Sequence, residues 1–166
     1  MAEAQQPQQP QQPQKNNFQL QRLYLKDLSF EVPNAPNIFK KEWKPEVNLE
    51  VNNTSTVVEG NVHEVVLKLT VTANVEGKVA FLVEVQQAGL FTIEGIEGVQ
   101  LEHVLKGVCA NILFPYAREA VSDVVSRGTF PQLLLQPINF EAAFAEQIRR
   151  QQEAAQKEKT DGEATH

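Results

Sequence analysis

The sequence predicts an α+β fold: a four-stranded antiparallel sheet with a long, proline-interrupted helix and a short C-terminal helix packed on one side. Three observations predict it. Apolar residues alternate at a spacing of two in the first half of the 166-residue chain, and this spacing becomes helical after residue 98. The connections between the second, third and fourth alternating segments are short, which favours antiparallel pairing.

The first predicted strand, residues 17–31, slips phase after Leu20 and again after Leu25, which indicates bulges or a strand that is apolar on both faces. Pro33 and Pro36 lack the donors of a strand ladder, so a crossover loop is expected after it.

The second strand alternates cleanly over 47–51, and the polar stretch 52–61 is predicted to be a turn. The third strand alternates over 65–71. A hairpin turn over 74–78, where Gly77 would supply a positive φ, leads into the fourth strand at 79–86.

A long helix is predicted from Leu101 to Val125, because apolar residues recur there in steps of four. Each step turns about 400°, so the apolar stripe precesses and wraps more of the helix than packing on one sheet requires. Pro115 cannot donate a helical hydrogen bond, so the helix is predicted to break or kink at Phe114. A final short helix is predicted over residues 140–151.

The ends of the chain differ in composition from its body. Residues 1–17 are rich in Gln and Pro and residues 151–166 are polar, so both are predicted to be disordered tails around a single domain, 18–150.

Bulk properties narrow the possible functions. A net charge of −6 and a pI near 5.1 argue against nucleic-acid binding. No apolar run is long enough to enter and cross a bilayer, and no signal-peptide pattern begins the chain. A single cysteine, Cys109, fits a reducing compartment, so a cytoplasmic protein is expected.

Candidates for chemistry are few. His103 and Cys109 are six residues apart on the predicted helix and therefore point in different directions, so they cannot share a metal. Cys109 lies on an apolar stripe, where a cysteine is more often a small buried hydrophobe than a nucleophile. We expect no catalytic residue, no metal site and no cofactor.

Two surface features remain. Asp27 and Glu31 point to one side of the first strand, and on the fourth strand Leu82 lies beside Glu84 on an otherwise polar face. This pattern fits either a solvated sheet face with one tolerated Leu or an acidic, partly apolar docking patch for a basic partner.

The second feature is a set of aromatic residues near the crossover and the final helix. They either cover one end of the core or line a groove that accepts extended peptide. The set comprises Phe39, Trp43, Phe140 and Phe144.

Three segments carry a specific resemblance: YLKDLSFEVPNAPNIF (24–39), FLVEVQQAGLFTIEGIEG (81–98) and NILFPYAREAVSDVVSRGTFPQLLLQPINF (111–140). With the positions between them, they are similar to SecB, a family of bacterial protein-export chaperones, over about residues 18–145. The resemblance implies a subunit of a homotetramer, a dimer of dimers with its long helices between two sheets. It also implies an ATP-independent cytosolic holdase that keeps preproteins unfolded and delivers them to the SecA motor.

The resemblance also implies roles for individual residues. The acidic sheet face would contact the zinc-bearing C-terminal tail of SecA, and the four aromatic residues would belong to the client groove. Subunit association would involve positions on the fourth strand and on the long helix. The expected SecA-binding residues are Asp27, Glu31, Leu82 and Glu84; the client residues are Phe39, Trp43, Phe140 and Phe144; the interface residues are Val83, Val85, Gln87, Val104, Val108 and Phe114.

Two other classes of function stay open from the residues alone. One is a small-ligand-binding protein or an enzyme on an α+β scaffold, and the other is a purely structural oligomer. Native mass and protection of an unfolded protein without nucleotide distinguish them from a chaperone.

Overall fold

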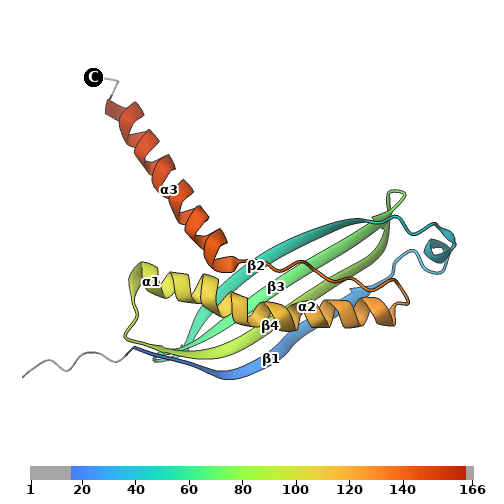
Figure 1. Cartoon of the computed structure of the whole chain (residues 1–166), viewed down its shortest axis with the longest axis horizontal. Coiled ribbons are helices and arrows are strands. Elements are labelled where there is room, and N and C mark those ends of the chain that lie inside the picture. The colour runs from blue at the N-terminus through green and yellow to red at the C-terminus, as the bar shows by residue number, and fades with distance from the viewer. Residues whose placement is uncertain (1–15, 164–166) are drawn as a thin grey trace, which may run out of the picture.

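The computed structural model describes residues 16–163 (Figure 1). Its four-stranded sheet has the order β1-β4-β3-β2, and each neighbouring pair is antiparallel. The predicted fold class is confirmed. The strands are β1 (Asn17–Glu31), β2 (Glu46–Glu59), β3 (Val62–Val75) and β4 (Lys78–Glu94).

Connection length explains the strand order. Tight turns join β2 to β3 and β3 to β4, so these three strands are neighbours in sequence and in space. The crossover after β1 contains the short 3₁₀ helix η1 (Asn37–Lys40) and carries the chain from one edge of the sheet to the other. Strands β1 and β2 are therefore the two edges.

The predicted phase slips in β1 are bulges. The pairing of β1 with β4 shifts register between Leu20 and Arg22 and again between Leu25 and Asp27. Each extra residue returns the next apolar side chain to the same side of the sheet. The apolar residues of the strand therefore share one face despite the irregular spacing.

Strand β2 is longer than predicted. The turn expected over 52–61 is wrong, because β2 continues to Glu59 and pairs with β3 along its length. Thr and Val side chains suit a pleated edge strand whose outer face is solvated, so polarity alone did not mark a turn. The actual turn is Gly60–Asn61, with Gly60 at φ 53°. Gly77 takes φ 75° in the β3–β4 hairpin, as predicted.

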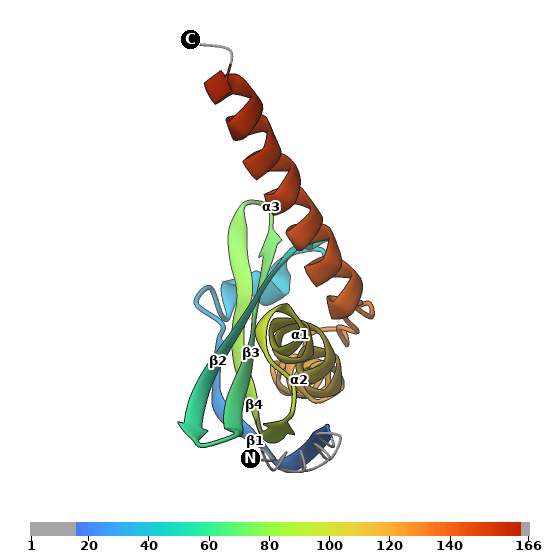
Figure 2. The same ribbon diagram turned by 90° about the vertical axis from the view of Figure 1, so that its left-hand side faces the viewer.

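One face of the sheet is covered by a helical rod made of α1 (Gly98–His103), the π-helical segment η2 (Val104–Val108) and α2 (Cys109–Arg127) (Figure 2). The core lies between this rod and strands β3 and β4. Alternate side chains of β3, including Val65, Leu67 and Leu69, are fully buried there.

Pro115 does not interrupt the helix, so the predicted break at Phe114 is wrong. Pro115 lies inside α2 with its ring exposed, and the irregular turn is η2, farther toward the N-terminus. Leu113 and Ala117, on either side of the proline, are fully buried and hold α2 on the sheet, so the one lost hydrogen bond does not break it. A π turn adds one residue, about 100° of rotation, and so re-aims the precessing stripe.

The C-terminal helix α3 (Phe140–Glu163) is also longer than predicted. An extended segment, 129–139, leads from α2 to α3, whose first turns pack on the helical rod while its remainder points away from the body (Figures 1 and 2). Residues 151–163, expected within a disordered tail, continue this helix. Most of the Gln/Pro-rich segment 1–17, and residues 164–166, lie outside the described residues.

Within residues 16–163, no helix has both the length and the apolar character needed to cross a membrane.

Candidate functional site

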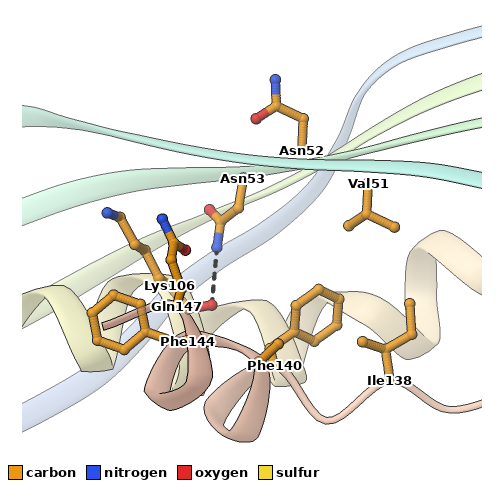
Figure 3. Close-up of a pocket in the computed structure, with 9 residues that line it drawn as sticks. Val51, Asn52, Asn53, Lys106, Ile138, Phe140, Phe144 and Gln147 are labelled. Carbon is orange, nitrogen blue, oxygen red and sulfur yellow. Dashed lines mark hydrogen bonds between the residues drawn. The ribbon is translucent and has the colours of Figure 1, made fainter. Parts of the chain in front are cut away.

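An open pocket of about 420 Å³ lies between β2 and the start of α3 (Figure 3). Val51, Ile138 and the rings of Phe140 and Phe144 supply its apolar walls. Its polar rim consists of Asn53, Lys106 and Gln147, whereas Asn52 lines the pocket with its side chain pointing away from it. The aromatic walls can bury apolar side chains of a ligand. The few amide and ammonium groups can form hydrogen bonds with its backbone.

Two asparagines hold the start of α3 in place. The Oδ1 atom of Asn139 accepts the backbone N–H of Ala142 at 3.0 Å, which caps the helix. From α2, Asn111 accepts the backbone N–H of Phe140 at 3.1 Å and donates to Glu141 Oε2 at 3.1 Å. The pocket wall is thus fixed to the helical rod by side-chain hydrogen bonds.

Close approach of α3 to η2 also requires a glycine. A Cβ atom on Gly107 would lie 2.9 Å from Cγ and 3.2 Å from Cα of Glu141. The carbonyl groups of η2 have partners on the sheet side, where Asn53 Nδ2 donates to the oxygen of Leu105 at 3.3 Å. It also donates to the oxygen of Lys106 at 3.2 Å (Figure 3). The π turn is therefore tied to β2 and α3 together.

Phe144 separates this pocket from a second one of about 570 Å³ near the N-terminus of α1. The Phe144 ring lies 6.0 Å from the ring of His103, centroid to centroid, and the Lys106 ammonium lies 5.5 Å from its centroid. The second pocket is mainly apolar, with walls that include Ile96, Val99 and Ile148.

The four aromatic residues predicted to line one groove fall into two groups. Phe140 and Phe144 line the first pocket, whereas Phe39 and Trp43 pack at a tilt against Phe130, with ring centroids 5.3 Å away in both cases. The extended segment 129–139 joins the two groups. Sequence spacing could not separate them, because the separation is set by the path of this segment over the helical rod.

The four predicted docking residues do share one face of the sheet, opposite the helical rod. In the register of β1 and β4, Glu31 is paired with Leu82, and Glu84 is paired with Ser29, two residues from both Glu31 and Asp27. Asp27 and Glu31 are exposed, and Leu82 and Glu84 are half-buried. Strand alternation predicted that Asp27 and Glu31 share one side of β1 and that Leu82 and Glu84 share one face of β4. The pairing of β1 with β4 brings these two sets together.

Lys68 on β3 is a neighbour that the sequence reasoning missed. Its ammonium lies 3.2 Å from Glu84 Oε1. The signal was present in the alternation of β3, where Lys68 belongs to the polar set, but the pairing of β3 with β4 decides which carboxylate it reaches.

A second polar group lies farther along the same face. Glu64 accepts hydrogen bonds from the hydroxyl of Tyr24 and from Lys26 Nζ, the latter at 2.8 Å. The hydrogen bonds from Lys26 and Tyr24 lower the pKa of Glu64. Burial, together with the hydrogen bond to the Glu64 carboxylate, raises the pKa of Tyr24 to about 12.

The residues expected at the subunit interface are mostly inside the subunit. Val83 and Val85 are fully buried beneath the helical rod and Gln87 is 5% exposed. Phe114, expected at the surface, is 4% exposed and packs on Phe140 with ring centroids 5.7 Å apart. These four side chains are therefore too buried to contact a partner directly. Of the six expected interface residues, only Val104 and Val108 are half-exposed.

A row of exposed apolar residues on β1 was not singled out from the sequence. They lie on the helix side of an edge strand that the rod covers only slightly. Their alternation was visible in the sequence, but the sequence did not show that β1 is an edge. They are Phe18, Leu20, Leu25 and Leu28.

Cys109 is completely buried, and this burial raises the pKa of its thiol to about 12. A thiol in this state is not a nucleophile near neutral pH. Among residues 16–163, no group of three or more His, Cys, Asp or Glu side chains is placed to hold a metal ion.

A family model described as preprotein translocase subunit SecB matches residues 10–151. The protein-export protein SecB of Marinobacter nauticus is 51% identical over 166 residues, 100% of both chains. A SecB-like chaperone of Mycobacterium tuberculosis, solved in complex with a peptide from an antitoxin, has a TM-score of 0.60 and 20% identity over 73% of this chain and 87% of that chain. This last similarity supports the fold alone.

Proposed function

Because this chain belongs to the SecB family of protein-export chaperones, we propose that it is an ATP-independent cytoplasmic holdase that keeps preproteins unfolded and delivers them to the SecA translocase motor. The observation that carries the proposal is the separation of two surfaces by the sheet. An apolar pocket with aromatic walls lies on the helix side, and an acidic face lies on the other. The family is one of chaperones rather than enzymes.

The client surface proposed here combines the pocket with the second aromatic group. Phe140 and Phe144 would bury apolar client side chains, and Phe39, which is 51% exposed, would offer a further contact. Leu134, on the segment between them, is also exposed. Burial of apolar groups discriminates little among sequences, and several weak contacts with one long chain add avidity through effective concentration.

The docking surface proposed for the zinc-bearing C-terminal tail of SecA consists of Asp27, Glu31, Leu82 and Glu84. The three carboxylates would attract a basic segment, and Leu82 would add apolar contact. Since these residues face away from the pocket, a docked partner and a held client need not compete for the same atoms. Delivery requires this independence.

The homotetramer proposed here, a dimer of dimers, would use the free edge of β1. Leu25 is 48% exposed there, and Phe18, Leu20 and Leu28 are each more than a third exposed. A second copy could cover this apolar row and pair with the strand edge. The positions Val83, Val85 and Gln87 would act indirectly, by supporting the helical rod from below, while Val104 and Val108 would contact a partner directly.

The test uses a double variant, Asp27→Lys with Glu84→Lys. It should weaken binding of purified SecA by at least tenfold and leave suppression of aggregation of an unfolded protein unchanged. The matched control, Glu46→Lys with Glu50→Lys, makes the same charge change on the same face but on β2, and should bind SecA within about twofold of wild type. Equal loss of SecA binding and client protection in the first variant would refute the two-surface proposal.

Native mass and client protection test the rest of the proposal. A tetramer that suppresses aggregation without nucleotide supports it. A tetramer that binds no unfolded protein would indicate a purely structural oligomer instead, and a monomer without protection would indicate a small-ligand-binding protein.

A further inference from the structure

Lys68 places a positive charge within the acidic face. It lies on β3 opposite Gln86 of β4, and its side chain crosses diagonally to Glu84, two residues along β4. Diagonal neighbours across antiparallel strands are within reach of long side chains. The ammonium and Glu84 Oε1 are 3.2 Å apart, and the two side chains are 39% and 30% exposed.

The three carboxylates of the docking surface therefore differ in their surroundings. Asp27 and Glu31 have no ion pair among the side chains that the structure describes, whereas Glu84 has Lys68 as its partner. Lys26, on β1 next to Asp27, forms an ion pair with Glu64 and so does not neutralise the docking carboxylates. A cation that approaches this face finds two free carboxylates and one that is already engaged.

We propose that Lys68 is an affinity-setting residue of the docking face: it holds Glu84 in an internal ion pair that a basic partner segment must displace. This inference deepens the proposed function and rests on it. An unfolded client carries lysines and arginines of its own, and an acidic face would attract them without discrimination. The internal pair lowers the affinity of every cation that uses Glu84 by the same factor. A partner segment that also contacts the free carboxylates of Asp27 and Glu31 keeps the rest of its binding energy.

The expected size follows from the exposure of the pair. Ion pairs between partly exposed side chains contribute little, and releasing Glu84 from one should tighten partner binding by about two- to fivefold. Because salt screens both the internal pair and the pair with the partner, this factor should fall toward one at 0.5 M NaCl.

The experiment measures the Kd of purified SecA for the full chain and for Lys68→Met in 50 mM and 500 mM NaCl. The matched control is Lys41→Met, which removes a lysine of similar exposure, 46%, from a 2.7 Å ion pair with Glu76 at the β3–β4 hairpin. Lys68→Arg retains the charge and should bind as wild type. Native mass of each variant confirms that the assembly is intact.

Tighter binding by Lys68→Met alone, and a smaller gain when Glu84→Gln is also present, support the proposal. An equal gain in Lys41→Met would show a general effect of net charge and overturn it. The proposal would also be overturned if Lys68→Met tightened SecA binding by the same factor with Glu84 and with Glu84→Gln, because Lys68 would then repel the partner directly. If Lys68→Met binds SecA as wild type does, the Lys68 proposal fails while the docking face stands. If wild type does not bind SecA, the proposed function fails and the Lys68 proposal fails with it.

Discussion

Replacement of Asn111 by Ala should loosen the first turns of α3 and weaken client binding. Asn111 makes two hydrogen bonds to this region, one from the backbone N–H of Phe140 and one to Glu141, each 3.1 Å long. The pocket wall formed by Phe140 and Phe144 belongs to the same turns. The variant thus perturbs the pocket without touching its apolar surface.

The size of the effect follows from these bonds. Each intramolecular hydrogen bond contributes about 0.5–1.5 kcal/mol net, so detachment of α3 should become easier by about 1–3 kcal/mol. Ala is also a better helix former than Asn by about 0.6 kcal/mol, and this gain stabilises α2, which stays folded when α3 opens. The free energy of unfolding should therefore fall by only about 0.5–2.5 kcal/mol, less than the local change.

Hydrogen exchange measured by mass spectrometry over residues 140–150 tests this prediction. Protection there should fall by about 5- to 150-fold, while exchange in β3 and β4 changes little. The Kd for a permanently unfolded protein should rise in parallel. Asn48→Ala is the control, because Asn48 is exposed on β2 and its side chain makes no hydrogen bond within the described part of the chain. Unchanged exchange over 140–150 in Asn111→Ala would refute the argument that Asn111 fixes the pocket wall.

Three further predictions concern stability and reactivity. Pro115→Ala restores a helical N–H at an exposed position and should raise the free energy of unfolding by about 1–3 kcal/mol; a fall in the denaturation midpoint would contradict this. Cys109 should not react with iodoacetamide at pH 8 in the native protein and should react fully in denaturant, which a mass measurement detects. The lowered pKa of Glu64 contributes stability that is fully present above its unfolded value of 4.5 and is lost progressively as pH falls below that value. Glu64→Gln should therefore cost about 1 kcal/mol at pH 7 and less at pH 3. An equal cost at both pH values would show that the charge of Glu64, bound by Lys26 and Tyr24, is not the cause.

Most of the strands could be predicted from local pattern. Alternation located β1, β3 and the first half of β4, and the two phase slips of β1 predicted its bulges. The second half of β4, which runs to Glu94, was missed. The second half of β2 was missed because an edge strand needs apolar residues on one face at most, so its polar residues resembled a turn. Whether a strand lies at the edge or in the centre is a property of the whole sheet, and the residue spacing within one strand does not reveal it.

Local spacing was also insufficient to predict the details of the helical rod. Proline was expected to break the helix, but burial of Leu113 and Ala117 beside it outweighs the single lost hydrogen bond. Phe114 was expected at the surface because a uniform helix would place it there, whereas the π turn of η2 changes the phase and α3 supplies Phe140 to cover it.

By itself, the sequence determined which residues of one strand share a face, and so put Asp27 with Glu31 and Leu82 with Glu84, because strand alternation is a local rule. The pairing of β1 with β4 brings the two sets together. The specific motifs of the sequence also determined the family. Only the tertiary structure decided that Lys68 reaches Glu84 and that the aromatic residues form two groups. These are contacts between segments far apart in sequence, and their geometry depends on strand register and on the path of the chain after α2, neither of which local spacing encodes.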